Sequence, residues 1–132
     1  MRQLVAKIIL FLVILFLVDT ALGICFQTLV DSAKGGETRR VNYICKQTSE
    51  DLLIFGSSRA LHHYDPLLLE DSLQMSCYNC GKDGNGIILL YGWFKMIQQR
   101  YHPQMIVYDV MPNFDLWKGD NMAYLPGLRY YY

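Results

Sequence analysis

The sequence predicts an α/β fold in which an N-terminal transmembrane helix precedes a partial parallel-sheet domain, three-layered and flavodoxin-like. Three short apolar runs after residue 50 lack polar alternation, which is typical of strands buried on both faces of a parallel sheet. Helical patterns separate these runs, so the order strand–helix–strand–helix–strand predicts helices on both faces. A chain of 132 residues has room for one small domain of this kind.

The N-terminal stretch is apolar enough to cross a membrane. Residues 8–18 are apolar without a break, and the wider stretch 4–26 is long enough, as a helix, to span a hydrocarbon core of about 30 Å. Arg2 and Lys7 favour a cytoplasmic N-terminus. We therefore expect residues 1–28 to anchor the chain in the lipid bilayer of the cytoplasmic membrane as a single-pass helix, with the domain on the extracytoplasmic, periplasmic side.

Two details of this stretch bear on how it is used. A carboxylate is costly at the middle of a bilayer and much less costly near an interface, so we expect Asp19 to lie close to the outer headgroups. Ala21-Leu22-Gly23 has the small-x-small pattern of a signal-peptidase site. A cleaved signal segment is therefore the alternative interpretation.

The rest of the chain divides into a linker and the domain. Residues 29–50 are polar and mixed, with a break at Gly35-Gly36 and a short amphipathic helix expected at 38–47. Residues 51–132 form the predicted domain, whose strands we place at 52–55, 76–79 and 105–110.

Two helices are expected between these strands. Asp65 and Pro66 have the residue types of a helix cap and a first helical residue. The second helix is expected at 86–101, with apolar residues at three- and four-residue spacing that face the core, namely Ile87, Leu90, Phe94, Ile97 and Tyr101.

Composition argues against several kinds of partner and cofactor. The 12 basic and 12 acidic residues give no net charge and no basic stripe, so nucleic acid is not expected as a partner. Cys77 and Cys80 have CxxC spacing, but no second ligand pair has matching spacing, and they fall on a predicted strand. We interpret them as small buried apolar residues and predict no metal and no cofactor.

Three loops follow the predicted strands, at residues 56–59, 81–86 and 111–115. Ligands of parallel sheets bind at the carboxyl ends of the strands, where these loops meet. Ser58 lies at a sharp turn between a buried strand and a helix, a suitable place for a nucleophile because the start of a helix favours developing negative charge. The glycines of the second loop allow a ligand to approach the backbone closely, and Asn113 in the third could donate to an oxyanion.

These loops resemble the conserved blocks of the SGNH (GDSL-like) hydrolases. Ile54-Phe55-Gly56-Ser57-Ser58-Arg59 is similar to the first block, with Ser57 in place of its aspartate. Asn79-Cys80-Gly81-Lys82-Asp83-Gly84 is similar to the second block, and residues 107–113 stand where the third would be. Gly-Ser-Ser-Arg-Ala followed by His-His-Tyr-Asp-Pro is similar to a membrane-anchored subgroup related to the D-alanine transfer protein DltD.

The resemblance, which covers residues 51–117, implies a function and three catalytic residues. Ser58 matches the nucleophile, Gly84 (with Gly81 as the second choice) matches the glycine of the oxyanion hole, and Asn113 matches its asparagine. Met111 and Phe114 depart from the third block. The implied activity is that of an extracytoplasmic serine esterase or O-acyltransferase, acting on an acylated cell-envelope glycan.

The fourth block of the family, Asp-x-x-His, which supplies the base, is missing from these 132 residues. The histidines present are His62, His63 and His102, which we interpret as surface or core residues. A serine is a poor nucleophile without an adjacent base. We therefore expect a truncated family member, inactive as this fragment.

Two other interpretations remain open. The chain could be a non-catalytic, membrane-tethered binding module or remnant. A nucleotide-binding domain is the weaker alternative, because Gly81-x-x-Gly84-x-Gly86 is not the dinucleotide-binding spacing and no acidic residue follows at about 20 positions.

Overall fold

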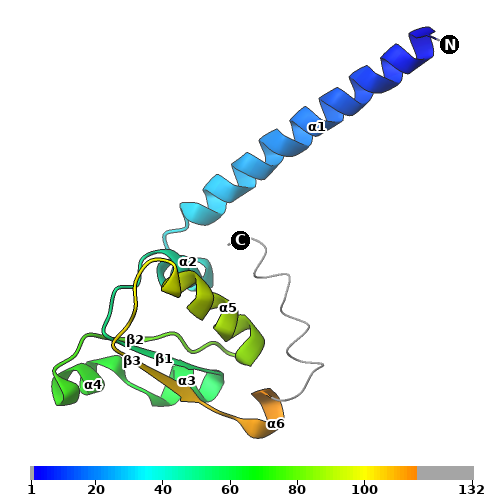
Figure 1. The fold of residues 1–132 in the computed structure, drawn as a ribbon. Helices are drawn as coiled ribbons and strands as arrows, with labels where there is room; N and C mark the ends of the chain where they lie inside the picture. The colour runs from blue at the N-terminus through cyan, green and yellow to red at the C-terminus, as the bar shows by residue number, and fades with distance from the viewer. Residues whose placement is uncertain (1, 116–132) are drawn as a thin grey trace. The chain divides into compact units, whose positions relative to one another are not determined.

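The computed structural model describes residues 2–115 (Figure 1). At residues 113 and 114 it describes the backbone but not the side chains. The chain divides into two units after Arg40. The expectation for residues 116–132, which belong to the predicted domain, lies outside the described residues.

The first unit is dominated by one long helix, α1 (Arg2–Asp31). Thirty helical residues extend about 45 Å at 1.5 Å per residue. None of its residues is buried within the chain, and the helix is long and apolar enough to cross a membrane. The helix continues through Asp19 and Ala21, so its backbone marks neither a membrane interface nor a cleavage site. The helix ends at Asp31, and the next helix begins at Gly36. Gly36 has a positive φ of 68°, a conformation that glycine adopts readily, so the expected break at Gly35-Gly36 falls at the start of the second helix.

The second unit is built on a three-stranded parallel sheet with the order β2-β1-β3 (Figure 1). The strands are β1 (Leu52–Gly56), β2 (Cys77–Asn79) and β3 (Met105–Asp109). The central strand pairs Leu52 with both Cys77 and Met105. The predicted α/β fold with a parallel sheet is confirmed.

Helices cover both faces of the sheet, as Figure 1 shows: α2 (Gly36–Lys46) and α5 (Ile87–Gln98) on one face, α3 (Ser58–His63) and α4 (Pro66–Leu73) on the other. Successive residues of β1 alternate between the two cores. Leu53 and Phe55 pack in a cluster with residues of α2 and α5. Leu52 and Ile54 pack in a second cluster with Ala60 of α3. The result is a helix–sheet–helix arrangement.

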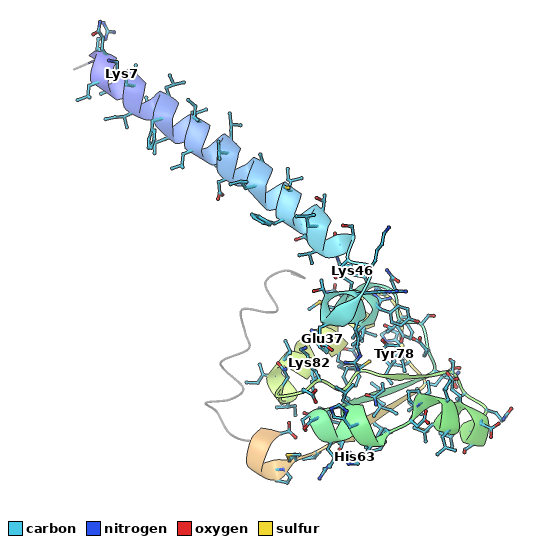
Figure 2. The ribbon with its side chains drawn as sticks, turned by 180° about the vertical axis from the view of Figure 1, so that it is seen from behind. Lys7, Glu37, Lys46, His63, Tyr78 and Lys82 are labelled. Carbon is cyan, nitrogen blue, oxygen red and sulfur yellow. The ribbon has the colours of Figure 1, made fainter. Side chains whose placement is uncertain are left out.

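The short helix expected in the linker contributes to the core. Ile44 and Cys45 of α2 are buried against the sheet. Tyr43 of the same helix lies against Tyr78 of β2, which Figure 2 labels, with ring centroids 4.8 Å apart and ring planes tilted by 43°. Arg100 donates hydrogen bonds to the carbonyl oxygens of Ile44 and Cys45 and so satisfies the free end of α2. These residues of α2 therefore pack with α5 in the helical layer on one face of the sheet.

Two details of packing differ from the prediction. Helix α5 buries most of the expected stripe: Leu90 and Ile97 are buried, and Phe94 and Tyr101 are partly buried against the same cluster, but Ile87 is 42% exposed. Trp93 and Met96 are buried as well, so the buried face is wider than the 3/4 spacing predicted. In addition, β3 was expected to be buried, but Met105 and Ile106 are exposed because β3 pairs on one edge only among the described residues.

The turn after β1 depends on a glycine. Gly56 has φ +151°, and a Cβ there would lie 2.6 Å from the Cβ of Ala60 and 3.0 Å from that of Asp109. We expect Gly56→Ala to lower the free energy of unfolding by about 2–5 kcal/mol, through backbone strain and overpacking together. Denaturant unfolding followed by circular dichroism measures this. Gly35→Ala is the matched control, since a Cβ there meets nothing within 4 Å. Equal stability of the two variants would contradict the packing described.

Membrane insertion of α1 can be tested by extraction. We expect the chain to stay with membranes through an alkaline carbonate wash and to be released by detergent. Leu12→Arg with Leu15→Arg should move it to the soluble fraction, because each arginine costs about 2.5–3.5 kcal/mol in a bilayer centre. Leu12→Ile with Leu15→Ile is the control and should stay bound. N-terminal sequencing of the chain recovered from the membrane and soluble fractions distinguishes an anchor, starting at Met1, from a cleaved signal segment.

Candidate functional site

The three loops predicted to meet at the carboxyl edge of the sheet are tied together. The backbone N–H of Lys82 donates to the carbonyl oxygen of Gly56 at 2.9 Å, which joins the second loop to the first. Arg59 forms an ion pair with Asp109, which joins the first loop to the end of β3. The third loop is then folded into the short helix α6 (Pro112–Asp115). The first loop is therefore bonded to the second loop and to the end of β3, directly before the third loop.

Ser58 is the first residue of α3 and is exposed. The sequence folds this way because β1 is apolar and buried throughout, and Gly56 allows the chain to turn sharply out of the sheet. Among the described residues no group forms a hydrogen bond with the Ser58 hydroxyl. A serine placed in this way is open to a ligand from solution.

The neighbouring serine has the opposite environment. Ser57 is the N-cap of α3 but makes no side-chain cap hydrogen bond. It is only 3% exposed, and its Oγ has no partner among the described residues. A buried hydroxyl without a hydrogen bond costs about 1–3 kcal/mol. Two adjacent serines therefore differ in access, and the accessible one is Ser58.

The two candidate glycines of the second loop differ in their exposure to solvent. Gly84 is exposed and has φ +66° at the tip of a turn. Gly81 is buried, and its N–H donates to the Oδ1 of Asn79 at 2.9 Å. A Cβ on Gly81 would lie 2.6 Å from the backbone nitrogen of Leu61. Gly81 therefore serves close packing against α3, and Gly84 remains the candidate donor.

Asn79 holds this loop against α3. Its Nδ2 donates to the carbonyl oxygens of Ala60 at 2.8 Å and Tyr64 at 2.9 Å. Asn113, the third predicted site residue, is the second residue of α6. Its side chain lies outside the described residues, so its role as a donor stays a prediction.

The Arg59–Asp109 pair was not predicted from the sequence. The Nε of Arg59 donates to one carboxylate oxygen of Asp109 at 2.7 Å, and its Nη2 donates to the other and to the carbonyl oxygen of Val110. The hydrogen bond from Arg59 lowers the pKa of Asp109, which is 9% exposed. Two features of the sequence could have indicated this pair: an arginine directly follows Ser58, and an aspartate stands at the end of the third predicted strand.

A second unpredicted contact lies beside Ser58. The Nε2 of His62 on α3 is 3.0 Å and 3.3 Å from the two carboxylate oxygens of Asp83 in the second loop. Both side chains are 60% exposed. His63 lies on the outer surface of α3 (Figure 2), with its Nδ1 3.0 Å from the carbonyl oxygen of Arg59. His62 and His63 are surface residues, as expected, but the partner of His62 was missed.

The cysteines do not form a second site. Cys77 and Cys80 are buried and form no disulfide, which confirms their interpretation as small buried apolar residues. Burial raises the pKa of the Cys77 thiol, and burial raises that of Cys45 to about 12. Both thiols are therefore protonated at neutral pH and poor nucleophiles. No cluster of three His, Cys, Asp or Glu side chains that could hold a metal occurs among residues 2–115.

Comparison of the chain with protein-family models, curated proteins and solved structures gave no match.

The Arg59–Asp109 pair makes stability depend on pH. Because the pKa of Asp109 is lowered in the folded chain, its stabilising contribution is present above the ordinary carboxyl pKa of about 3.9 and is lost as pH falls through the lower folded value. We expect Asp109→Asn to be less stable than the wild type at neutral pH, with the difference shrinking in acid. Urea unfolding at a series of pH values measures it. Asp71→Asn, on exposed α4, is the control. A difference that does not change with pH would contradict this account.

Proposed function

We propose that the chain carries the nucleophile of a membrane-anchored serine ester hydrolase or O-acyltransferase of the SGNH type, acting on the extracytoplasmic side of the membrane. Ser58 attacks the acyl carbonyl of an acylated cell-envelope glycan or a similar ester. The developing oxyanion accepts hydrogen bonds from the N–H groups of Ser58 and Gly84 and from the amide of Asn113.

One observation carries the proposal. Ser58 stands exposed at the turn between a strand buried on both faces and a helix, with its hydroxyl unbonded among the described residues. A buried strand on one side and α3 on the other fix the position of this hydroxyl. Its own N–H belongs to the first turn of α3, where backbone N–H groups have no partner within the helix. A nucleophile and a donor therefore come from the same residue.

The arrangement of the loops supports the same chemistry. The bond from Lys82 to Gly56 joins the second loop to the first, and the bonds from Arg59 to Asp109 join the first loop to the end of β3. Donors held in place before the reaction stabilise charge without reorganisation. The helix α1, long and apolar enough to cross a membrane, fits a site that works on substrates of the envelope.

A second candidate function is a membrane-tethered binding module without turnover. The observation that favours it is that no imidazole forms a hydrogen bond with the Ser58 hydroxyl among residues 2–115. Such a module would hold an acylated ligand at the same loops and release it unchanged. Covalent labelling of Ser58 separates the two.

A fluorophosphonate probe, which reacts with activated serines, tests the proposal on the full chain in detergent micelles. We expect the wild type to be labelled and Ser58→Ala to lose all labelling, since the attacking oxygen is gone. Ser57→Ala is the matched control: it removes a buried, unbonded hydroxyl and should fold stably and remain labelled. An unlabelled wild type would favour the binding module, and labelling that survives Ser58→Ala would contradict the proposal.

A further inference from the structure

The chemistry proposed for Ser58 requires the second loop to be held at a fixed distance from that serine. Ser58 begins α3, whereas the candidate donor Gly84 is exposed at the tip of a turn after β2. A donor must lie about 3 Å from the oxygen on which negative charge develops. Because α3 and the loop belong to different elements, the bonds between them determine whether the donor of Gly84 meets that oxygen.

The helix that begins at Ser58 depends on bonds from outside for its orientation. Helix α3 has six residues, and a helix this short is marginal in water without tertiary contacts. Its N-cap residue Ser57 makes no side-chain cap hydrogen bond. The last four carbonyl groups of any helix have no partner within the helix, so the carboxyl end of α3 offers acceptors to neighbouring elements.

Asn79, the last residue of β2, bonds to these acceptors. Its Nδ2 donates to the carbonyl oxygens of Ala60 at 2.8 Å and of Tyr64 at 2.9 Å, and that of Leu61 lies at 3.5 Å. A primary amide has two N–H donors, enough for the two short bonds. Asn79 is only 7% exposed, so water competes little for these bonds. The carboxyl end of α3 is therefore anchored to the sheet.

The oxygen of the same amide holds the second loop. The Oδ1 of Asn79 accepts a hydrogen bond from the N–H of Gly81 at 2.9 Å. This bond between a side chain and the backbone two residues later is an Asx turn, which fixes the direction in which the chain leaves β2. Gly84 follows three residues after Gly81. One planar amide thus bonds to the helix of Ser58 through its nitrogen and to the loop of Gly84 through its oxygen.

Two other contacts show how closely the loop lies against α3. A Cβ on Gly81 would lie 2.6 Å from the backbone nitrogen of Leu61, so the loop and the helix are in close contact. The pair of His62 and Asp83 also joins them, but both side chains are 60% exposed, and exposed ion pairs contribute little. The buried amide of Asn79 is therefore the stronger of the two side-chain ties between α3 and the loop.

We propose that Asn79 is a positioning residue, whose amide sets the distance between Ser58 and the oxyanion donor of Gly84; this inference rests on the function proposed for Ser58. Asn79 is buried and does not touch the substrate. Its loss lets the second loop and α3 shift relative to each other, so the donor of Gly84 no longer meets the developing oxyanion. The variant therefore binds a reagent as before and reacts with it more slowly.

The test is the rate of fluorophosphonate labelling of the full chain in detergent micelles, measured over a range of probe concentrations. Asn79→Ser keeps a hydroxyl that can accept from the N–H of Gly81, but its side chain is too short to reach the carbonyl oxygens of α3. We expect its maximal labelling rate to fall about 10–100-fold, because a displacement of about 1 Å can cost about 100-fold. The probe concentration that gives half the maximal rate should stay close to the wild-type value.

Glu70→Ala is the matched control for a loss of stability alone. The Oε1 of Glu70 on α4 accepts a hydrogen bond from the N–H of Cys77 at 2.8 Å, so Glu70 also ties a helix to β2 but touches none of the three loops. We expect this variant to be less stable than the wild type and to label at the wild-type maximal rate. Urea unfolding gives the stability of each variant, and labelling is measured where circular dichroism shows both to be folded.

A second variant, Asn79→Asp, tests the donor itself. The aspartate keeps the shape of the side chain and the acceptor for Gly81, but its carboxylate has no hydrogen to donate to the carbonyl oxygen of Ala60. The protonated carboxyl has one, and burial raises the pKa of a carboxyl, so the donor returns as pH falls. We expect the labelling rate of Asn79→Asp, divided by the wild-type rate at the same pH, to rise in acid, whereas the same ratio for Asn79→Ser should not.

The outcomes separate this inference from the function on which it rests. If Ser58 is labelled in the wild type and both Asn79 variants reach the maximal rate of Glu70→Ala, Asn79 is a structural residue only, while the function proposed for Ser58 stands. If the wild type is not labelled at all, the proposed function fails and the role of Asn79 fails with it.

Discussion

The central strand β1 is paired on both edges and buried on both faces, and the rest of the domain is arranged around it. Its alternate side chains form the two cores, so one five-residue run connects α2 and α5 to α3. The same strand ends at Gly56, whose backbone turns out of the sheet and delivers Ser58 to the surface. Ala60 and Asp109 pack so closely against Gly56 that the turn has no room for a Cβ. The position of the candidate nucleophile is therefore a consequence of the core.

Much of this framework was predictable because it depends on local patterns. Unalternated apolar runs predicted the strands, and Asp65 does cap α4 by accepting a hydrogen bond from the N–H of Leu67. On α5, Leu90 and Ile97 are buried as predicted, whereas Ile87 is exposed and Trp93 is buried, since spacing alone does not fix how far around the helix the buried face extends. At the site, the position of Ser58 followed from the strand and the turn. The contacts Arg59–Asp109 and His62–Asp83 could not be predicted, because they join side chains 50 and 21 residues apart whose approach depends on the assembled sheet.

The domain contains two kinds of nucleophile, and burial separates them. Cys45 and Cys77 are packed in the cores, where desolvation raises the pKa of each thiol and keeps it protonated. Ser57 is buried as well, and its hydroxyl faces no partner among the described residues. Ser58 alone of these four stands at the surface, on the edge where the first loop is bonded to the second loop and to the end of β3. Ser58 is therefore exposed and held between a buried strand and a helix, which is the physical basis for proposing acyl-transfer chemistry there.

The most direct measurement is the site of a trapped acyl group. Incubating the full chain with an activated ester, quenching in acid and sequencing the tryptic peptide of residues 47–59 by mass spectrometry would locate a covalent adduct. This peptide contains both Ser57 and Ser58, and fragmentation distinguishes them. The account predicts one acyl group, carried on Ser58. An adduct on Ser57 or on another residue, or no adduct under conditions that keep the chain folded, would contradict it.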